Sequence, residues 1–365
     1  MILLSPAPLT SRSSTPGDVH SLAVLELVRS ALRQEAPGMD ETTPYRARTF
    51  EDLLNALPAR FGFVPRESII GICVSGPRHR LGFTARMDLP PDDEHADAVA
   101  RTVVHHLIRN GGDGVILVGL SADPGAAEDM VHRVRELLPA HLPEVLGLWA
   151  TEDRVWSDLP DCPAEGEAYA LSPTHEVRVR AATEGVVVAE DREELWYELE
   201  PVGRPRRDWL DRAFADIVAE WIPVGPSWQR DHARQMARLL DRESFADGEL
   251  LAMSVLSQWI PGRDTAWARI GAHNARGMYD IWAAAARLVG GVEATPMLCL
   301  AGFAAWQAGD GARAINALDR ARALNPEYTF AGLLGRMVEC GMDPRVMDSM
   351  DTESWERRFA DRRSA

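Results

Sequence analysis

The spacing of hydrophobic residues changes once along this chain, and this change constrains the fold more than any other feature. Up to about residue 200, the strongest apolar runs are short and rich in β-branched residues, as in 68–75 (SIIGICVS) and 115–120 (VILVGL). Beyond it, apolar residues recur every three or four positions, as at Leu210, Phe214 and Ile217. Short β-branched runs indicate buried strands, whereas the longer recurrence indicates amphipathic helices. An α/β part followed by an all-helical part is therefore predicted.

The first part is predicted to be an α/β domain with a mixed sheet and flanking helices. The runs 68–75 and 81–89 form two strands of a hairpin, because Gly76-Pro77 interrupts them. Strands and helices then alternate, which is typical of an α/β layer. The later elements are expected as helices at 94–110 and 124–138, strands at 115–120 and 145–149, and extensions of the sheet at 154–159 and 186–188.

The second part is predicted to be a set of helices held together by tryptophan side chains. Breakers separate the amphipathic stretches at Pro223, Gly225-Pro226, Pro261-Gly262 and Gly290-Gly291. Core packing explains tryptophans on apolar stripes better than a ligand cage does, because large aromatic residues contribute most to helical cores. The tryptophans in question are Trp209, Trp221, Trp228, Trp259, Trp267, Trp282 and Trp306.

Residues 298–326 resemble one tetratricopeptide-type repeat. Small residues at the repeat positions would let two antiparallel helices approach closely, with Gly309-Asp310-Gly311 as the turn. A close-packed helical hairpin outside any repeat array explains the same pattern. The residues that match the repeat spacing are Gly302, Ala305, Ala314, Leu318, Ala321 and Pro326.

The ends of the chain are predicted to lie outside the two domains. Asp18 is a suitable N-cap for an amphipathic helix that carries Leu22 and Leu25, and Thr49 with Asp52 forms a capping-box pattern before a second helix. The predicted division is a tail and amphipathic helix at 1–45, the α/β domain at 46–200, the helical domain at 201–345 and a C-terminal tail at 346–365.

Composition excludes several classes of function. The net charge of -16 disfavours nucleic acid and anionic membranes as partners, because both require a cationic surface. No apolar run reaches the roughly 20 residues of a membrane span, and the N-terminus lacks a signal-peptide pattern, so a cytoplasmic location is expected. The cysteines, which form no CxxC pair, are expected to be reduced, with two distant disulfides as the alternative. They are Cys73, Cys162, Cys299 and Cys340.

Several short motifs together resemble one protein family. They are 57–70 (LPARFGFVPRESII), 86–90 (RMDLP), 154–166 (RVWSDLPDCPAEG), 192–195 (REEL), 263–264 (RD) and 306–326, with Gly309-Asp310-Gly311 inside the last. The chain resembles, over about residues 50–344, the actinobacterial domain-of-unknown-function family numbered 4192. The family often has a second cysteine where this chain has Asp158-Leu159, so a cysteine-pair metal or redox site is not expected. The resemblance implies a domain organisation and a bacterial cytoplasmic setting, and it implies no activity.

No established catalytic motif is present, and no metal site or cofactor is assigned. The P-loop, the dinucleotide fingerprint that follows a strand, HExxH and GxSxG are all absent from the sequence. The candidate ligand-binding residues are polar groups within the family motifs, namely Arg86, Asp88, Arg192, Arg263 and Asp264.

Each candidate also has a structural interpretation. Arg86 and Asp88 lie on the same face of a strand, where they form either an anion clamp with a general base or a simple ion pair. Arg192 is expected to open a helix that Asp191 caps. Asp264 is placed to cap the helix that carries Trp267, with Arg263 available for an ion pair between domains.

Two functions follow from these patterns. The first is a non-catalytic binding or regulatory protein that uses its helical domain to bind a protein partner. The second is an enzyme or sensor for a small anionic metabolite or nucleotide, bound in the α/β domain or between the domains. The absence of a catalytic motif favours the first.

Overall fold

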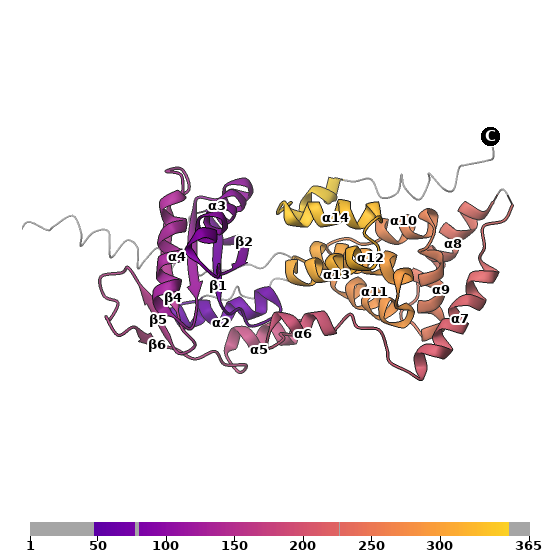
Figure 1. Cartoon of the computed structure of the whole chain (residues 1–365), viewed down its shortest axis with the longest axis horizontal. Coiled ribbons are helices and arrows are strands. Elements are labelled where there is room, and N and C mark those ends of the chain that lie inside the picture. Colours follow the sequence, from indigo (N-terminus) through magenta and orange to yellow (C-terminus); the bar gives the residue numbers. More distant parts are fainter. Residues whose placement is uncertain (1–46, 77–79, 226, 350–365) are drawn as a thin grey trace, which may run out of the picture. The chain divides into compact units, whose positions relative to one another are not determined.

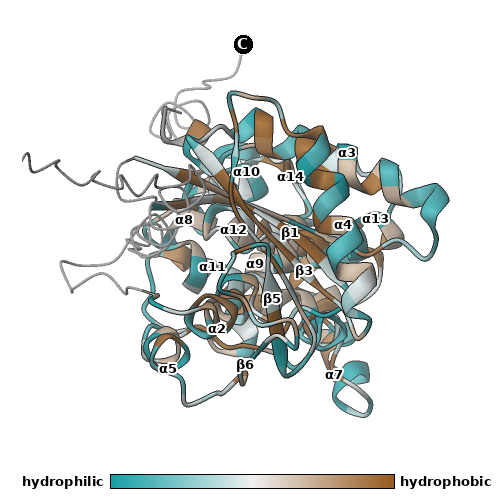
Figure 2. Cartoon of the chain, turned by 90° about the vertical axis from the view of Figure 1, so that its left-hand side faces the viewer, coloured by the Kyte–Doolittle hydropathy of each residue, from teal (hydrophilic) through white to brown (hydrophobic). Residues whose placement is uncertain are grey.

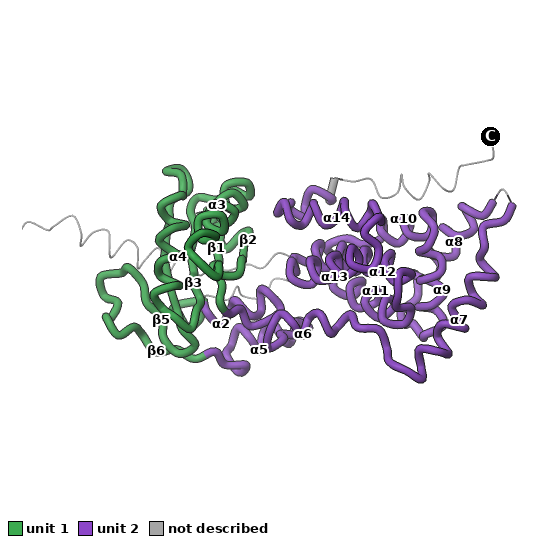
Figure 3. Tube along the Cα trace, viewed as in Figure 1, with its two compact units in different colours: residues 1–36, 42–53, 67–170 green, residues 37–41, 54–66, 171–365 purple. Residues whose placement is uncertain are grey.

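The computed structural model describes residues 47–76, 80–225 and 227–349, which form thirteen α-helices and one six-stranded sheet (Figure 1). The predicted helix that begins at Asp18 and the tail after residue 349 lie outside these residues. The chain divides into two compact units (Figure 3). Of the described residues, 47–53 and 67–170 belong to the first unit, and 54–66 and 171–349 belong to the second.

The first unit is the α/β part. Its sheet has the strand order β2-β1-β3-β4-β5-β6, in which only β3 and β4 are parallel neighbours. The mixed sheet and the order of its elements confirm the prediction, and β6 is an addition whose two exposed residues gave no pattern. The elements are β1 (Ser68–Ser75), β2 (Arg80–Asp88), α3 (Asp93–Asn110), β3 (Gly114–Leu120), α4 (Pro124–Leu137), β4 (Glu144–Ala150), β5 (Arg154–Ser157) and β6 (Glu167–Ala168).

Strands β1 and β3 form the buried centre of this sheet. Every residue of β3 is buried, which explains why its sequence is continuously apolar rather than alternating (Figure 2). One face packs against α3 and α4, where Ile69 and Leu117 of the strands join Val103 and Val131 of the helices in one hydrophobic cluster.

The second unit is helical. Between residues 201 and 349 the described residues form no strand, as the apolar period predicts. The elements are α5 (Glu176–Thr183), α6 (Arg192–Tyr197), α7 (Arg206–Glu220), α8 (Trp228–Leu240), α9 (Asp247–Leu256), α10 (Ile260–Ala268), α11 (Ala275–Val289), the 3₁₀ helix η1 (Val292–Ala294), α12 (Thr295–Gln307), α13 (Gly311–Leu324), α14 (Thr329–Glu339) and the 3₁₀ helix η2 (Pro344–Ser349).

The division between the units falls after Ala170, earlier than the predicted boundary at residue 200. The reason is that α6 packs against α13, so the segment after the sheet belongs to the helical unit. Helix α2 (Phe50–Phe61) is divided between the units at Leu53. The capping box before it is confirmed, since Thr49 Oγ1 accepts from the Asp52 amide at 3.1 Å and Asp52 accepts from the Thr49 amide at 3.1 Å.

The expected strand at 186–188 is not present. Instead, the neighbouring Ala189 forms an isolated parallel bridge with Phe63, in which the Ala189 amide donates to the Gly62 carbonyl at 2.8 Å. The segment that contains residues 186–188 belongs to the second unit and not to the unit that holds the sheet.

Helix α12 is the centre of the helical unit. All its residues are buried, and it packs against α11 on one side and α13 on the other. The contact with α13 requires a small residue, because a Cβ at Gly302 would lie 2.7 Å from Leu318 Cγ and 3.2 Å from the Ala314 carbonyl oxygen. The α12–α13 hairpin is therefore close-packed at Gly302.

We expect Gly302→Ala to destabilise the protein, by about 1–3 kcal/mol, because the added methyl group overpacks this contact. The matched control is Gly332→Ala in α14, where a Cβ would meet no atom within 4 Å. The free energy of unfolding of that control should rise by about 0.5–1 kcal/mol, because alanine loses less backbone entropy than glycine when the helix forms. Thermal unfolding followed by tryptophan fluorescence measures both, and equal shifts of the midpoint for the two variants would contradict the close packing.

Candidate functional site

Arg86 and Asp88 of β2 are brought together as an ion pair. Arg86 Nη2 lies 2.5 Å from Asp88 Oδ1, and Arg86 Nε donates to Ser68 Oγ at 2.9 Å. The Arg86 side chain is only 12% exposed, and Ser68, opposite Asp88 in the register, is fully buried. This geometry matches the structural interpretation of the pair, in which its charges satisfy each other.

The neighbouring Glu67 binds the end of β3 to the start of β1. Its carboxylate accepts from the Ser121 hydroxyl at 2.8 Å and from the Ala122 amide at 2.7 Å, just before α4 begins. Glu67 has a φ of 39°, a value that residues other than glycine rarely adopt. The two contacts of its carboxylate therefore hold a strained backbone in place. The Ser121 hydroxyl and the Ala122 amide, which follow β3, thus already have the Glu67 carboxylate as their acceptor.

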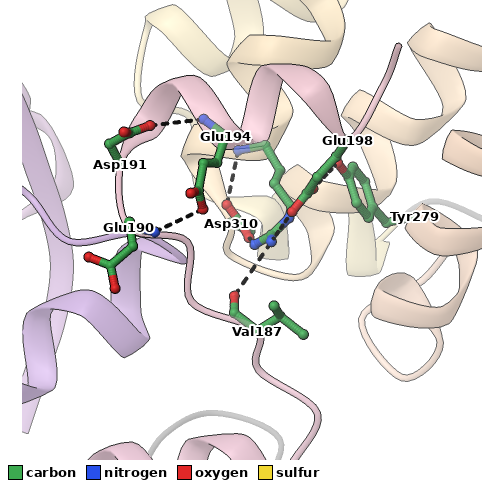
Figure 4. A network of polar contacts seen from close by, with 8 residues as sticks. Val187, Glu190, Asp191, Glu194, Glu198, Tyr279 and Asp310 are labelled. Carbon is green, nitrogen blue, oxygen red and sulfur yellow. Dashed lines mark hydrogen bonds and ion pairs between the residues drawn. The ribbon is translucent and has the colours of Figure 1, made fainter. Parts of the chain in front are cut away.

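Arg192 lies at the first position of α6, where the expected helix start is confirmed. Asp191 is the N-cap, and its carboxylate accepts from the Glu194 amide at 2.9 Å. The Glu194 carboxylate in turn accepts from the amide of Glu190, one residue before the N-cap, at 3.0 Å (Figure 4).

Asp264 does not cap a helix, and this prediction was wrong. Helix α10 begins at Ile260 with Pro261 in its first turn, a favoured position for proline, so Asp264 lies inside the helix. Its carboxylate accepts from Arg263, whose Nη2 lies 2.7 Å away. The Arg263 guanidinium also stacks on the Phe330 ring of α14, 4.5 Å from its centroid, so its contacts lie within the helical unit and not between units.

The structure therefore separates the candidates into two groups. Arg86 with Asp88 belongs to the first unit, and Arg192, Arg263 and Asp264 belong to the second. Burial lowers the pKa of Arg263, but the Tyr328 hydroxyl and the Asp264 carboxylate outweigh it and raise the pKa overall. Each of these two arginines is thus paired with an aspartate close to it in the sequence.

Sequence patterns did not single out Arg313, whose partners include Glu198, Asp310 and Val187, three of the residues labelled in Figure 4. Its Nη2 lies 2.7 Å from Glu198 Oε1, and its Nη1 lies 2.8 Å from Asp310 Oδ2. It also donates to the Val187 carbonyl at 3.5 Å, and the Tyr279 hydroxyl contacts the same glutamate at 3.1 Å. The available signal was the spacing of three between Asp310 and Arg313 within a family motif.

The electrostatics of this network are those of a closed cluster. Burial lowers the pKa of Arg313, but its bonds to Glu198 and the Asp310 charge reverse the direction and raise it. Burial and the Glu198 charge raise the pKa of Tyr279. Gly62 adjoins the cluster: its φ of 75° disfavours a side chain, and a Cβ there would lie 2.5 Å from Arg313 Nη1. The Arg313 network can hold α6 and α13 together. Its charged groups use their hydrogen bonds for these contacts.

A second feature of the helical unit is a ring of tryptophans around a buried histidine. The centroid of the His232 ring on α8 lies 4.9 Å from that of Trp259, 5.3 Å from that of Trp228 and 5.8 Å from that of Trp221. The three tryptophans are half-buried, whereas the imidazole is buried with its Nδ1 lacking a hydrogen-bond partner among the described residues.

Exposed apolar residues adjoin this ring in the chain. Ile222 and Val224 follow Trp221 and are 52% and 76% exposed, and Ile260 follows Trp259 and is 58% exposed. We call the set the tryptophan–histidine surface: Trp221, Ile222, Val224, Trp228, His232, Trp259 and Ile260. A concentration of apolar side chains on a surface is typical of a protein interaction site.

The interpretation of all seven helical tryptophans as core residues holds only in part. Trp282 and Trp306 are buried, but Trp209 on α7 is 53% exposed. Helix α7 buries only Leu210, so Trp209, one position earlier and about 100° away around the axis, points off the narrow buried stripe.

Within the described residues, no group of three or more His, Cys, Asp or Glu side chains could hold a metal ion. The four cysteines are free thiols, and burial raises the pKa of Cys73 to about 11 and that of Cys299 to about 12. None of the helices in the described residues has the length and apolarity needed to cross a membrane.

The fold and these sites define a protein with an α/β unit and a helical unit, in which several charged motif residues form ion pairs within their own unit. A family model described as "Domain of unknown function (DUF4192)" matches residues 51–345, and the chain belongs to this family. No curated protein and no solved structure matches the chain.

We expect Arg313→Met to destabilise the helical unit by about 3 kcal/mol, because it leaves two partly buried carboxylates without their cation. The control is Arg212→Met on α7, an exposed arginine, which should change the free energy of unfolding by less than about 0.5 kcal/mol. Urea unfolding of both variants provides the measurement. A loss below 1 kcal/mol for Arg313→Met, on the order of an exposed pair, would refute the central role of the network.

Stability should also depend on His232 below neutral pH. Burial lowers the pKa of His232, although a backbone hydrogen bond with Trp221 and the Asp231 charge oppose this effect. The unfolded chain therefore takes up the proton first, so the stabilising contribution is present above the ordinary value of 6.5 and is lost as the pH falls below it.

From pH 7 to pH 5, His232→Gln should lose less stability than the wild type, by no more than about 2 kcal/mol. The exposed His273 provides the control, and His273→Gln should keep the pH dependence of the wild type. Parallel curves of unfolding free energy against pH for wild type and His232→Gln would contradict this assignment.

Proposed function

We propose that this protein is a non-catalytic binding protein that engages a protein partner through the tryptophan–histidine surface of its helical unit. The observation that carries the proposal is the packing of three half-buried tryptophans around His232, with the exposed residues Ile222, Val224 and Ile260 close to two of them in the chain. Tryptophans fixed by packing but still reachable are the residues that contribute most to protein–protein affinity.

The internal pairing of the charged motifs supports binding over catalysis. A catalytic arginine or carboxylate needs unused hydrogen-bonding capacity for a substrate, whereas Arg313 with Glu198 and Arg263 with Asp264 form closed pairs. The helical unit then has the role of a rigid scaffold. Its α12–α13 hairpin is consistent with a tetratricopeptide-type repeat, a class of helical hairpin that presents surfaces to partners.

A cytoplasmic, bacterial setting, with an actinobacterial origin, belongs to the same proposal. Its support is the family membership and the four free thiols, which suit a reducing compartment.

A second candidate function has one observation in its favour. The Ser121 hydroxyl and the Ala122 amide donate to the Glu67 carboxylate at the end of β3, which makes this strand end a place where an anion is accommodated. An enzyme or sensor for a small anionic metabolite would use this end of the α/β unit. Arg86 lies on β2 opposite Ile70 of β1, three residues after Glu67 in the chain. Such a ligand would have to displace Glu67, and for this reason we favour the protein-binding function.

The surface is tested by Ile222→Asp combined with Val224→Asp, two changes at exposed positions that should leave the fold intact. The matched control is Leu333→Asp on α14, also an exposed apolar residue at 49%. Affinity purification from the native host, followed by quantitative mass spectrometry, should recover a protein with the wild type and the control. Its recovery with the double variant should fall at least about tenfold, the loss expected at an interface hot spot.

The recovered protein, used as bait, should in turn capture the wild type and not the double variant. Circular dichroism and the thermal midpoint establish that the variants are folded. Equal recovery with the double variant, or no protein recovered above background with the wild type, would refute this function.

A further inference from the structure

The imidazole of His232 connects the end of α7 to α8. Helix α7 packs against α9 and α11, whereas α8 packs against α10 and α9. Trp221 is the C-cap residue of α7, and the centroid of its ring lies 5.8 Å from that of His232 on α8. The residues 222–225 that follow α7 are therefore held at their start by a contact with this histidine.

These residues are the part of the tryptophan–histidine surface that packing restrains least. Ile222 and Val224 are 52% and 76% exposed. Trp228 and Trp259, in contrast, begin or precede helices that pack against each other, α8 and α10. Exposed segments with few buried side chains open more readily than packed helices do. If one side of the ring around His232 opens, we expect it to be the side of Trp221.

The surroundings of the imidazole favour its neutral form. His232 is 2% exposed, and its Nδ1 is buried without a hydrogen-bond partner among the described residues. An imidazolium carries an N–H on both ring nitrogens, so Nδ1 would become a charged donor without an acceptor among three indole rings. Burying such a group is costly, and exposure to water removes the cost.

One described carboxylate opposes this effect. The Asp231 charge and a backbone hydrogen bond with Trp221 favour the charged imidazole, but burial outweighs them and lowers its pKa. The other charged groups face different partners or act too weakly to change this direction, as Glu249 pairs with Arg242 and Arg263 with Asp264. On the last turn of α7 and on α8, α9 and α10 they are Glu220, Arg230, Arg234, Arg238, Asp247, Glu249, Arg263 and Asp264.

We propose that His232 makes the tryptophan–histidine surface a pH-sensitive binding site. The neutral imidazole holds Trp221 against α8, and in this closed form the surface binds its protein partner. Uptake of a proton turns the ring toward water, separates Trp221 and residues 222–225 from α8, and releases the partner. Release follows because interface tryptophans contribute to affinity when packing fixes them in place. This inference rests on the proposed function and specifies how binding is regulated.

Fluorine NMR of the full chain, labelled with 5-fluorotryptophan and assigned by single Trp→Phe variants, tests the opening without any partner. Between pH 7.5 and 5, the signals of Trp221, Trp228 and Trp259 should move with one common midpoint below 6.5. The buried Trp282 and Trp306 should keep their signals, because the rest of the helical unit stays folded.

The difference in fluorine shift between H₂O and D₂O then measures the exposure of each indole. Below the midpoint, this difference for Trp221 should rise towards that of Trp209, whose side chain is already 53% exposed. His232→Gln and His232→Phe should both abolish the titration, and the phenylalanine also fills the apolar site if the glutamine variant folds poorly. His273→Gln is the matched control, since His273 is exposed, and should titrate as the wild type does.

Three results would overturn the inference. The first is a common midpoint above 6.5, which would mean that the indoles stabilise the imidazolium. The second is a titration that leaves the exposure of Trp221 unchanged. The third is movement of Trp282 and Trp306 at the same pH, which would show acid unfolding of the whole unit.

The partner recovered in the capture experiment provides the functional test. Its retention on immobilised wild type should fall at least about tenfold between pH 7 and pH 5, the scale of losing an interface hot spot, and should stay unchanged with His232→Phe. A partner retained equally at both pH values would refute the regulation and leave the proposed function standing. Failure to capture any partner would refute the proposed function, whereas the fluorine titration decides the opening of the surface independently.

Discussion

The guanidinium of Arg313 is the group on which the helical unit depends. It joins Glu198 after α6 to Asp310 at the start of α13, and it reaches the carbonyl of Val187. A partly buried ion pair adds little net stability over apolar packing, but its geometry admits few alternatives. The network therefore fixes how α6 and α13 meet. It also explains two glycine-containing motifs, because Gly62 leaves room for the guanidinium and Asp310 both caps α13 and binds Arg313.

The distribution of paired charges separates structural from functional groups. In the α/β unit, Arg86 is used by Asp88 and Ser68, and Glu67 is used by Ser121. Because these groups form ion pairs and hydrogen bonds with one another, we interpret these family motifs as structural and not as binding sites. The helical unit departs from this arrangement around His232, where the rings of Trp221, Trp228 and Trp259 are only half-buried. An interaction surface is the economical explanation of that contrast.

Local rules predicted much of the fold and less of the candidate site. Thr49 with Asp52 and Asp191 with Glu194 were recognisable as caps because the groups that pair are three residues apart and the pairing is local. Asp264 was misassigned because proline at the second helical position moves the start of α10 upstream. Trp209 was misassigned because a stripe shared with Leu210 does not define which of two adjacent residues faces the core.

The sequence by itself determined the two-part architecture, most of the strands and helices, and the family, because each depends on hydrophobic period or on motifs of adjacent residues. Only the tertiary structure decided which polar residues meet. Arg313 is separated from Glu198 by 115 positions, and no local pattern encodes such a pairing. The same holds for the tryptophan–histidine surface, since Trp221, His232 and Trp259 come together only when α8 packs against α10. Burial of these side chains is a property of packed helices, and periodicity shows which face of a helix is apolar but not which neighbour will cover it.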